Sequence, residues 1–235
     1  MLELEEQNLH IEPHHRAPEF IRDIVIGMSD GLTVPFALAA GLTGSVSTTT
    51  LIVTAGMAEI AAGAIAMGLG GYLAVKTDHE YYVAELERER LEVDEMPHIE
   101  REEVASILRR WGLAEQTVND AVESITENPK RWIAFMMRYE LGLEKPAKTR
   151  ARNSSLTIGL SYITGGLIPL LPYILFDKPA TALLISVLVT LLALLVFGYV
   201  KGKFTGTSPL KSSLQTALVG GVAAGVAFMA AKWLA

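Results

Sequence analysis

The sequence predicts an all-α membrane protein, with five transmembrane helices and an acidic helical insertion between the second and the third. Half of the 235 residues are apolar, and the mean hydropathy is +0.33. Charge is segregated along the chain, because 17 of the 26 acidic residues lie between Asp78 and Glu144. Five nearly uncharged apolar runs flank that region, and each is about as long as the ~20 residues that a membrane-spanning helix needs.

These contrasts divide the chain into four predicted regions. Residues 1–23 mix Glu, His, Pro and Arg without an apolar core, so we expect a cytosolic segment and not a cleaved signal peptide. Residues 24–76 are predicted to form transmembrane helices one and two. Residues 77–150, called the acidic module below, are predicted to be helical and cytosolic. Residues 151–235 supply transmembrane helices three to five.

The first predicted span, Ile24–Gly44, contains a carboxylate and a proline, Asp30 and Pro35. A carboxylate at membrane depth costs about 2.5–3.5 kcal/mol on insertion scales, so such residues are rare and usually functional. Pro35 has no N–H to donate to the helix, which leaves backbone carbonyl oxygen unpaired near Gly31. One turn of helix therefore offers a carboxylate and carbonyl oxygens to a cation.

The second predicted span, Leu51–Val75, carries a single charge, Glu59, among many glycines that allow close helix packing. Counting ~1.5 Å per residue from the cytosolic ends of the two spans puts Asp30 about 9 Å deep and Met67 about 12 Å deep. Asp30, Met67 and Glu59 are therefore predicted to mark a stepped path for a cation. The alternative is that both carboxylates hydrogen-bond to neighbouring helices and that Met67 only packs.

Basic residues set the predicted orientation. Thirteen lysines and arginines lie between Lys76 and Arg152, whereas only Lys178 and Lys232 lie in the segments that face the other side. By the positive-inside rule the N-terminus and the acidic module are cytosolic, and an odd number of spans puts the C-terminus on the opposite side. The three spans that follow the module are Leu156–Phe176, Ala180–Val200 and Leu214–Ala231.

The acidic module is predicted to form four helices, without strands or internal repeats. Proline starts a helix readily and glycine ends one, so these residues set the predicted boundaries. The first helix continues the second span without a stop signal as far as Met96, before Pro97. The other three are predicted at about His98–Gly112, Glu115–Thr126 and Pro129–Gly142.

Helical-wheel positions place several carboxylates of the module on the apolar faces of their helices, where surface charge is not expected. The third module helix is the exception, because it has only Glu115 at the edge of its apolar stripe. On the other three helices, the carboxylates inside the stripe or at its edge are Glu85, Glu89 and Glu92, then Glu100 and Glu103, and finally Glu140.

Carboxylates that face a shared interior repel one another unless they are protonated, paired or bridged by cations. Two pairs of these carboxylates, Glu89 with Glu92 and Glu100 with Glu103, are spaced i,i+3, so each pair could hold one ion from a single helix face. Glutamate oxygens alone suit Ca²⁺, Mg²⁺ or Mn²⁺, whereas a thioether from Met136 or Met137 would favour a softer ion such as Fe²⁺ or Zn²⁺. The absence of cysteine excludes thiolate ligands. The alternative is a solvated acidic bundle in which methionine only fills the core.

Three motifs are long and specific: DIVIGMSDGLTVPFALAAGL in the first span, AGMAEIAAGAIAMGLGGYLA in the second, and KSSLQTALVGG at the start of the fifth. Together with the glutamate-rich insertion they resemble the vacuolar iron transporter family, and closely its plant type, over nearly the whole chain. The resemblance implies a homodimer of five-helix subunits in a vacuolar membrane. It also implies exchange of Fe²⁺ for protons, with iron moving from the cytosol into a vacuole or a similar acidic store and the C-terminus in the lumen.

The resemblance further implies roles for individual residues. The residues matching Asp30 and Met67 would bind the ion in transit, in a passage that the first span lines at the dimer interface, and the residue matching Glu59 is also implicated. The insertion would be the family's cytosolic metal-binding domain. Its implied ligands are Glu89, Glu92, Glu100, Glu103, Met136, Met137 and Glu140, and the helical wheel adds Glu85 as an edge candidate.

Three functions are compatible with these features. The first is a proton-coupled antiporter for Fe²⁺, whose sites would also accept Zn²⁺, Mn²⁺ or Co²⁺ because these ions share the same ligand types. The alternative is a metal-gated divalent cation channel, or a metal sensor, without proton coupling. The third is a structural membrane scaffold that binds no metal. The acidic net charge of −6 argues against nucleic acid as a partner, and no catalytic arrangement or phosphate-binding loop suggests an enzyme.

Overall fold

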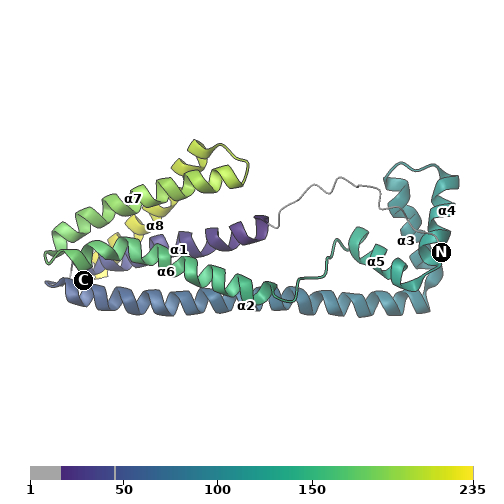
Figure 1. Cartoon of the computed structure of the whole chain (residues 1–235), viewed down its shortest axis with the longest axis horizontal. Helices are drawn as coiled ribbons and strands as arrows, with labels where there is room; N and C mark the ends of the chain where they lie inside the picture. The colour runs from purple at the N-terminus through teal and green to yellow at the C-terminus, as the bar shows by residue number, and fades with distance from the viewer. Residues whose placement is uncertain (1–16, 45, 235) are drawn as a thin grey trace, which may run out of the picture. The chain divides into compact units, whose positions relative to one another are not determined.

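The computed structural model describes residues 17–44 and 46–234, and the regular structure within these ranges is entirely α-helical. Five of the helices described are long and apolar enough to cross a membrane, so the predicted five-span fold with its helical insertion is confirmed (Figure 1). The helices are α1 (Ala17–Thr43), α2 (Thr49–Glu95), α3 (Pro97–Arg110), α4 (Glu115–Thr126), α5 (Pro129–Tyr139), α6 (Arg150–Leu175), α7 (Pro179–Phe204) and α8 (Pro209–Leu234).

The chain forms two compact units that share the long helix α2. Of the described residues, 17–44, 46–71 and 152–234 belong to the membrane unit, and Tyr72–Ala151 form the module unit. The 47 residues of α2 make a helix about 70 Å long, more than twice the ~30 Å of a bilayer's hydrocarbon core. Only part of α2 can therefore cross a membrane, and its last turns, which carry Glu89, belong to the module unit.

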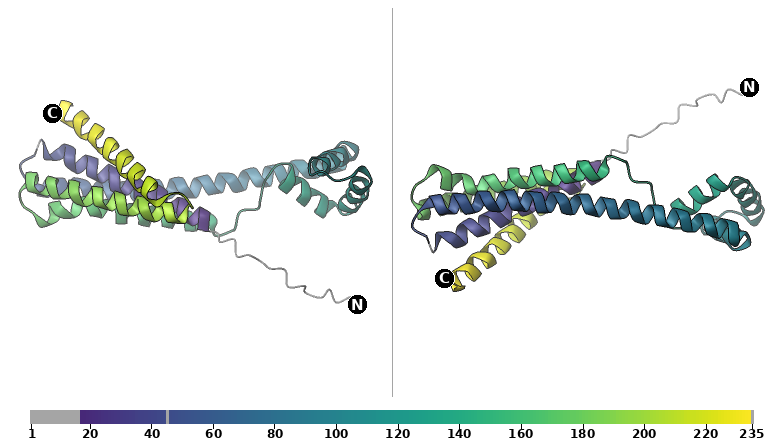
Figure 2. Two further views of the ribbon diagram at one scale, coloured as in Figure 1. Left: turned by 90° about the horizontal axis from the view of Figure 1, so that it is seen from above. Right: turned by 90° about the horizontal axis from the view of Figure 1, so that it is seen from below.

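Small residues let the helices of the membrane unit approach one another closely. Gly27 and Gly31 on α1 face the backbone of α6, where an added Cβ would overlap the carbonyl oxygens of Ile158 and Tyr162. On α2, Gly63 makes room for the ring of Tyr162, and the right view in Figure 2 shows α6 in green running beside α2 in blue. Such close contact stabilises helix pairs in a membrane, where water cannot drive their association.

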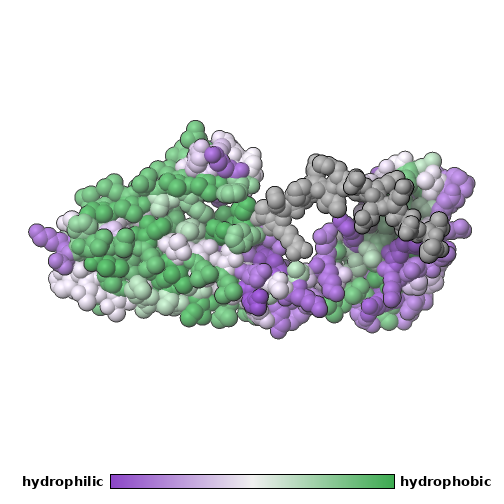
Figure 3. Space-filling view, in the orientation of Figure 1, coloured by the Kyte–Doolittle hydropathy of each residue, from purple (hydrophilic) through white to green (hydrophobic). Residues whose placement is uncertain are grey.

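Helices α1, α7 and α8 also pack against one another, which brings the helix that carries Asp30 next to the last two spans. At the end of α1, Ala39 packs with Ile52, Tyr173 and Ala182 in a buried apolar cluster. The face of the membrane unit drawn in Figure 3 is mostly apolar over α6 and α7, as expected of a surface in contact with lipid.

The module unit has a small apolar core of Val93, Val104, Trp132 and Met136, which come from α2, α3 and α5. Asn128 caps α5, because its side-chain oxygen accepts hydrogen bonds from two backbone N–H groups of the first turn. Hydrophilic side chains cover much of the module unit in Figure 3. Packing in the apolar core sets how α2, α3 and α5 are rotated about their axes, and this rotation decides which of their side chains face one another.

The predicted C-terminal ends of two module helices lie a few residues beyond the ends in the structure. The sequence predicts ends at Gly112 and Gly142, whereas α3 ends at Arg110 and α5 ends at Tyr139. Both glycines have positive φ, +82° and +65°, a conformation that glycine adopts without the steric cost of a side chain. They therefore lie just beyond their helices and reverse the chain there.

Candidate functional site

Three carboxylates converge in the module unit. Glu89 on α2, Glu100 on α3 and Glu140 directly after α5 each place a carboxylate oxygen within 4.8 Å of the others. Glu89 and Glu100 are only 3% exposed, and one oxygen of each is buried without a hydrogen-bond partner. Glu140 lies at the surface and opens the group to solvent. We call these three residues the carboxylate triad.

Burial and mutual repulsion make the triad hold protons more tightly than ordinary glutamates do. Burial raises the pKa of Glu89 from 4.5 to about 7, and the charges of Glu140 and Glu100 add to the effect. The pKa of Glu100 also rises to about 7, first through burial and then through the charges of Glu103 and Glu140. Burial, followed by the charge of Glu103, raises the pKa of Glu140. A divalent cation bound here would satisfy the buried oxygens and remove the repulsion.

The other predicted metal ligands of the module lie around the triad in different settings. Glu92 forms an ion pair with Arg88, with 3.1 Å between its Oε1 atom and Arg88 Nε. Glu103 is half-buried and acts electrostatically on all three triad carboxylates. Met136 and Met137 are buried, and Met136 packs in the apolar core of the module unit. The structure thus brings together three of the predicted carboxylates, and the full ligand set stays a prediction.

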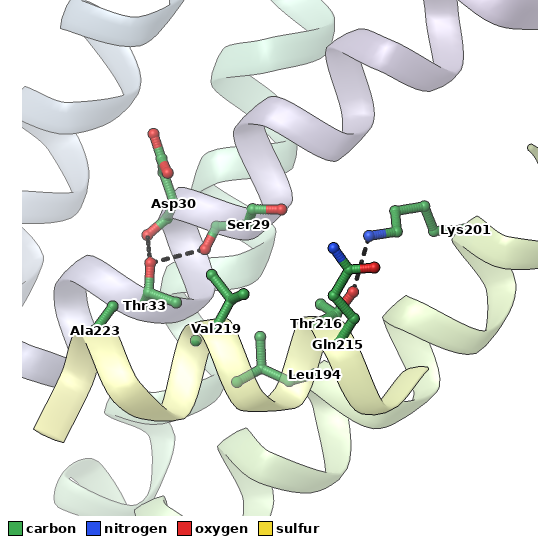
Figure 4. A pocket seen from close by; sticks show the side chains of 10 residues that line it. Ser29, Asp30, Thr33, Leu194, Lys201, Gln215, Thr216, Val219 and Ala223 are labelled. Atoms are coloured by element: carbon green, nitrogen blue, oxygen red, sulfur yellow. Dashed lines mark hydrogen bonds between the residues drawn. The ribbon is translucent and has the colours of Figure 1, made fainter. Parts of the chain in front are cut away.

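In the membrane unit, Asp30 lies at a cavity of about 330 Å³ between α1, α7 and α8. The hydroxyl of Thr33 donates a hydrogen bond of 2.9 Å to the carbonyl oxygen of Ser29, one turn earlier, and the carboxylate of Asp30 points away from α8 (Figure 4). The residues that line the cavity are Ser29, Asp30, Thr33, Leu194, Lys201, Gln215, Thr216, Val219, Gly220 and Ala223.

A lysine also lies at this cavity, a position that the sequence does not predict. Lys201, near the end of α7, donates a hydrogen bond of 2.9 Å from Nζ to Thr216 Oγ1 on α8. Helical spacing places Lys201 at the end of a span but does not indicate which helices it faces. Its ammonium group gives the cavity a positive charge, at the side away from Asp30 in Figure 4.

The third predicted path residue, Glu59, is held by a neighbouring helix. The hydroxyl of Tyr162 on α6 donates a hydrogen bond to one carboxylate oxygen of Glu59, and the other oxygen is buried without a partner. Tyr162 is itself buried, and the charges of both Glu59 and Asp30 act on its hydroxyl. Nothing in the sequence singles out Tyr162, because a tyrosine in an apolar span is typical of ordinary packing.

Met67, the remaining predicted path residue, is half-buried on α2 and does not line the cavity beside Asp30. Asp30 and Met67 are predicted at similar depths in the membrane, but within this chain they do not line the same cavity. The path through Asp30, Met67 and Glu59 stays a prediction. Its elements in the described chain are a cavity at Asp30 and a tyrosine-held carboxylate at Glu59.

Five apolar helices, with carboxylates both among them and in a helical module, define a polytopic membrane protein suited to handling cations. The chain belongs to the VIT family, the vacuolar iron transporters, whose family model matches residues 21–232. This is a family of transporters and not of enzymes.

Individual relatives are similar over most of their length. Vacuolar iron transporter 1 of Tulipa gesneriana is 52% identical over 223 residues, which cover 95% of this chain and 90% of the relative. Vacuolar iron transporter 1 of Arabidopsis thaliana is 50% identical over 234 residues, which cover 98% and 94%. Protein CCC1 of Saccharomyces cerevisiae is 40% identical over 225 residues, which cover 92% and 70%.

Proposed function

We propose that this protein is a proton-coupled antiporter that moves Fe²⁺ from the cytosol into a vacuole-like acidic store. Family membership and the names of the relatives support iron as the ion and the vacuole as its destination. The observation that carries the proposal is the carboxylate triad, because two buried carboxylates with unpartnered oxygens call for a cation. Zn²⁺, Mn²⁺ and Co²⁺ have overlapping ligand preferences and would compete for the same sites.

The two units have different tasks in this proposal. The module captures Fe²⁺ from the cytosol, and its ligand set comprises the triad together with Glu92, Glu103, Met136 and Met137. A pKa of about 7 at Glu89 and Glu100 means that an arriving ion displaces protons at cytosolic pH. Capture is therefore efficient in a neutral cytosol and weak in an acidic compartment.

The membrane unit carries the ion across the bilayer. Asp30 and Met67 accept Fe²⁺ after it loses part of its water shell, and Glu59, oriented by Tyr162, lies further along the path. Protons from the acidic lumen then displace the ion at the exit, because protonation removes the negative charge that holds it. The N-terminus and the module are cytosolic and the C-terminus is lumenal, and two copies of the chain form the transporter.

Transport into proteoliposomes tests this function. Fe²⁺ uptake is measured with an acidic interior and without a pH gradient, for the wild type, Asp30→Asn and the control Asp177→Asn, whose side chain is exposed between α6 and α7. We expect uptake to require the gradient and Asp30, and the control to transport as the wild type does. Uptake that ignores the gradient would instead indicate a channel, and uptake by Asp30→Asn would remove Asp30 from the path.

A further inference from the structure

Arg88 places a positive charge among the carboxylates of the module. It lies on α2 between Glu85 and Glu92, one turn from each, and its guanidinium group contacts both. The Nε atom is 3.1 Å from Glu92 Oε1, and one terminal nitrogen is 3.6 Å from Glu85 Oε2. Arg88 therefore ties together the two edge carboxylates of the same helix face that carries Glu89.

The exposure of these side chains differs in a way that matters for function. The side chain of Arg88 is 65% exposed, whereas those of Glu85 and Glu92 are only 16% and 24% exposed. An ion pair one helical turn apart, whose arginine lies mostly in solvent, stabilises a fold only modestly, so stability alone does not explain this arrangement. The guanidinium group of Arg88 lies at the surface, so it can move away from the two glutamates into solvent without disturbing the core.

The charge of Arg88 also reaches the triad. It counteracts the rise in the pKa of both Glu100 and Glu140, which lie on other elements of the module unit. Arg110 has the same effect on Glu140. Arg88 is thus a cation whose field covers the triad while its guanidinium group holds Glu92.

We propose that Arg88 is an internal counter-cation that competes with divalent metal for Glu92, so that its charge limits how tightly the module binds ions. The proposal rests on the metal-capture role given to the module above. A divalent ion that uses Glu92 must first displace the guanidinium group into solvent. Arg88 is then a residue that sets affinity, and not itself a metal ligand.

This competition favours divalent over monovalent cations. An arginine keeps its positive charge throughout the physiological pH range, so it must move rather than lose a proton. A monovalent ion offers Glu92 no more charge than the guanidinium group already does, and it lacks the directed hydrogen bond that Arg88 Nε donates to Glu92. A divalent ion offers twice the charge in a smaller volume, so it can displace the arginine.

The size of the effect follows from Coulomb's law. A unit charge about 7 Å from a divalent ion, in water and at physiological salt, changes the affinity of that ion by roughly two- to eightfold. Removing the charge of Arg88 should therefore raise divalent-metal affinity by that factor. The gain should shrink at high salt, because the interaction is screened there.

The chain offers a matched control on the same helix. Arg90 pairs with Glu87 at 3.1 Å, again within one turn of α2, but both side chains are mostly exposed and Glu87 is not among the inward or edge carboxylates. Isothermal titration of Zn²⁺ and Co²⁺ into the full-length protein in detergent, after treatment with a chelator, compares the wild type with Arg88→Gln and Arg90→Gln. Circular dichroism checks that each variant keeps its helices.

We expect Arg88→Gln to bind both ions two- to eightfold more tightly and Arg90→Gln to match the wild type. Arg88→Lys keeps a positive charge and should shift the affinity less than Arg88→Gln. Equal shifts in Arg88→Gln and Arg90→Gln, or weaker binding by Arg88→Gln, would overturn the role of Arg88 while leaving metal capture intact. A wild-type protein that binds neither ion would overturn metal capture and the role of Arg88 together.

Discussion

Replacing Glu89 by glutamine should stabilise the module unit at alkaline pH and leave it unchanged in acid. Glu89 is 3% exposed, and its pKa rises from 4.5 to about 7 because it is buried beside other carboxylates. The folded protein therefore holds a proton on Glu89 between about pH 4.5 and 7 that the unfolded chain has already released. By linkage, the free energy of unfolding falls as the pH rises through this window, and the full penalty is present above about pH 7.

A pKa difference of this size corresponds to about 3 kcal/mol. The expected gain is smaller, because Glu89 shares its protons with two neighbouring carboxylates and solvent reaches the triad through Glu140. We expect Glu89→Gln to raise the free energy of unfolding by roughly 1–2 kcal/mol at pH 8 and by nearly nothing at pH 4.5. Glutamine has the same shape as the protonated glutamate, so packing is preserved.

Urea unfolding in detergent, with a chelator present, measures this effect. Trp132 is buried in the core of the module unit, so its fluorescence reports on that unit once Trp111 and Trp233 are replaced by phenylalanine. Glu123→Gln, at an exposed position on α4, serves as the control and should show no pH-dependent gain. Equal stability of Glu89→Gln and the wild type at pH 8, or an equal gain at both pH values, would refute the electrostatic argument.

Two further predictions concern the membrane unit. Tyr162→Phe removes the hydrogen bond to Glu59 and should slow Fe²⁺ uptake severalfold without changing metal binding by the module. Tyr199→Phe, at a half-exposed position on α7, is its control. Normal uptake by Tyr162→Phe would contradict the proposal that Tyr162 orients Glu59 for transport. Gly31→Ala places a methyl group against the backbone of α6 and should lower the midpoint of thermal unfolding by several degrees, whereas Gly70→Ala has open space and should not.

The structure separates two kinds of carboxylate in this protein. Those of the triad come from α2, α3 and the residue directly after α5, all in the module unit, and one buried oxygen each of Glu89 and Glu100 has no hydrogen-bond partner. Glu59, in contrast, lies in a span and is held by Tyr162. This difference supports a capture role for the first kind and an oriented role in a transport path for the second.

Much of the fold follows from local properties of the chain. Apolar length identifies the five spans, and proline and glycine mark the module helices to within a few residues. Helical periodicity also indicates that Glu89, Glu100 and Glu140 turn toward the interior of the module. Each of these properties depends on residues within a few turns of one another, which is why sequence spacing alone is enough to find them.

Contacts between helices depend on how each helix is rotated and packed, which spacing along one helix does not specify. Only the tertiary structure therefore decided that Glu89, Glu100 and Glu140 meet in one group. It likewise decided that Tyr162 meets Glu59 across 103 positions of the chain. The ion pair of Glu92 with Arg88, in contrast, follows from i,i+4 spacing along α2. The sequence by itself determined which side chains turn toward the interior, because periodicity along one helix is enough for that. Packing determined which groups on different helices become partners, because such a contact depends on two helix faces.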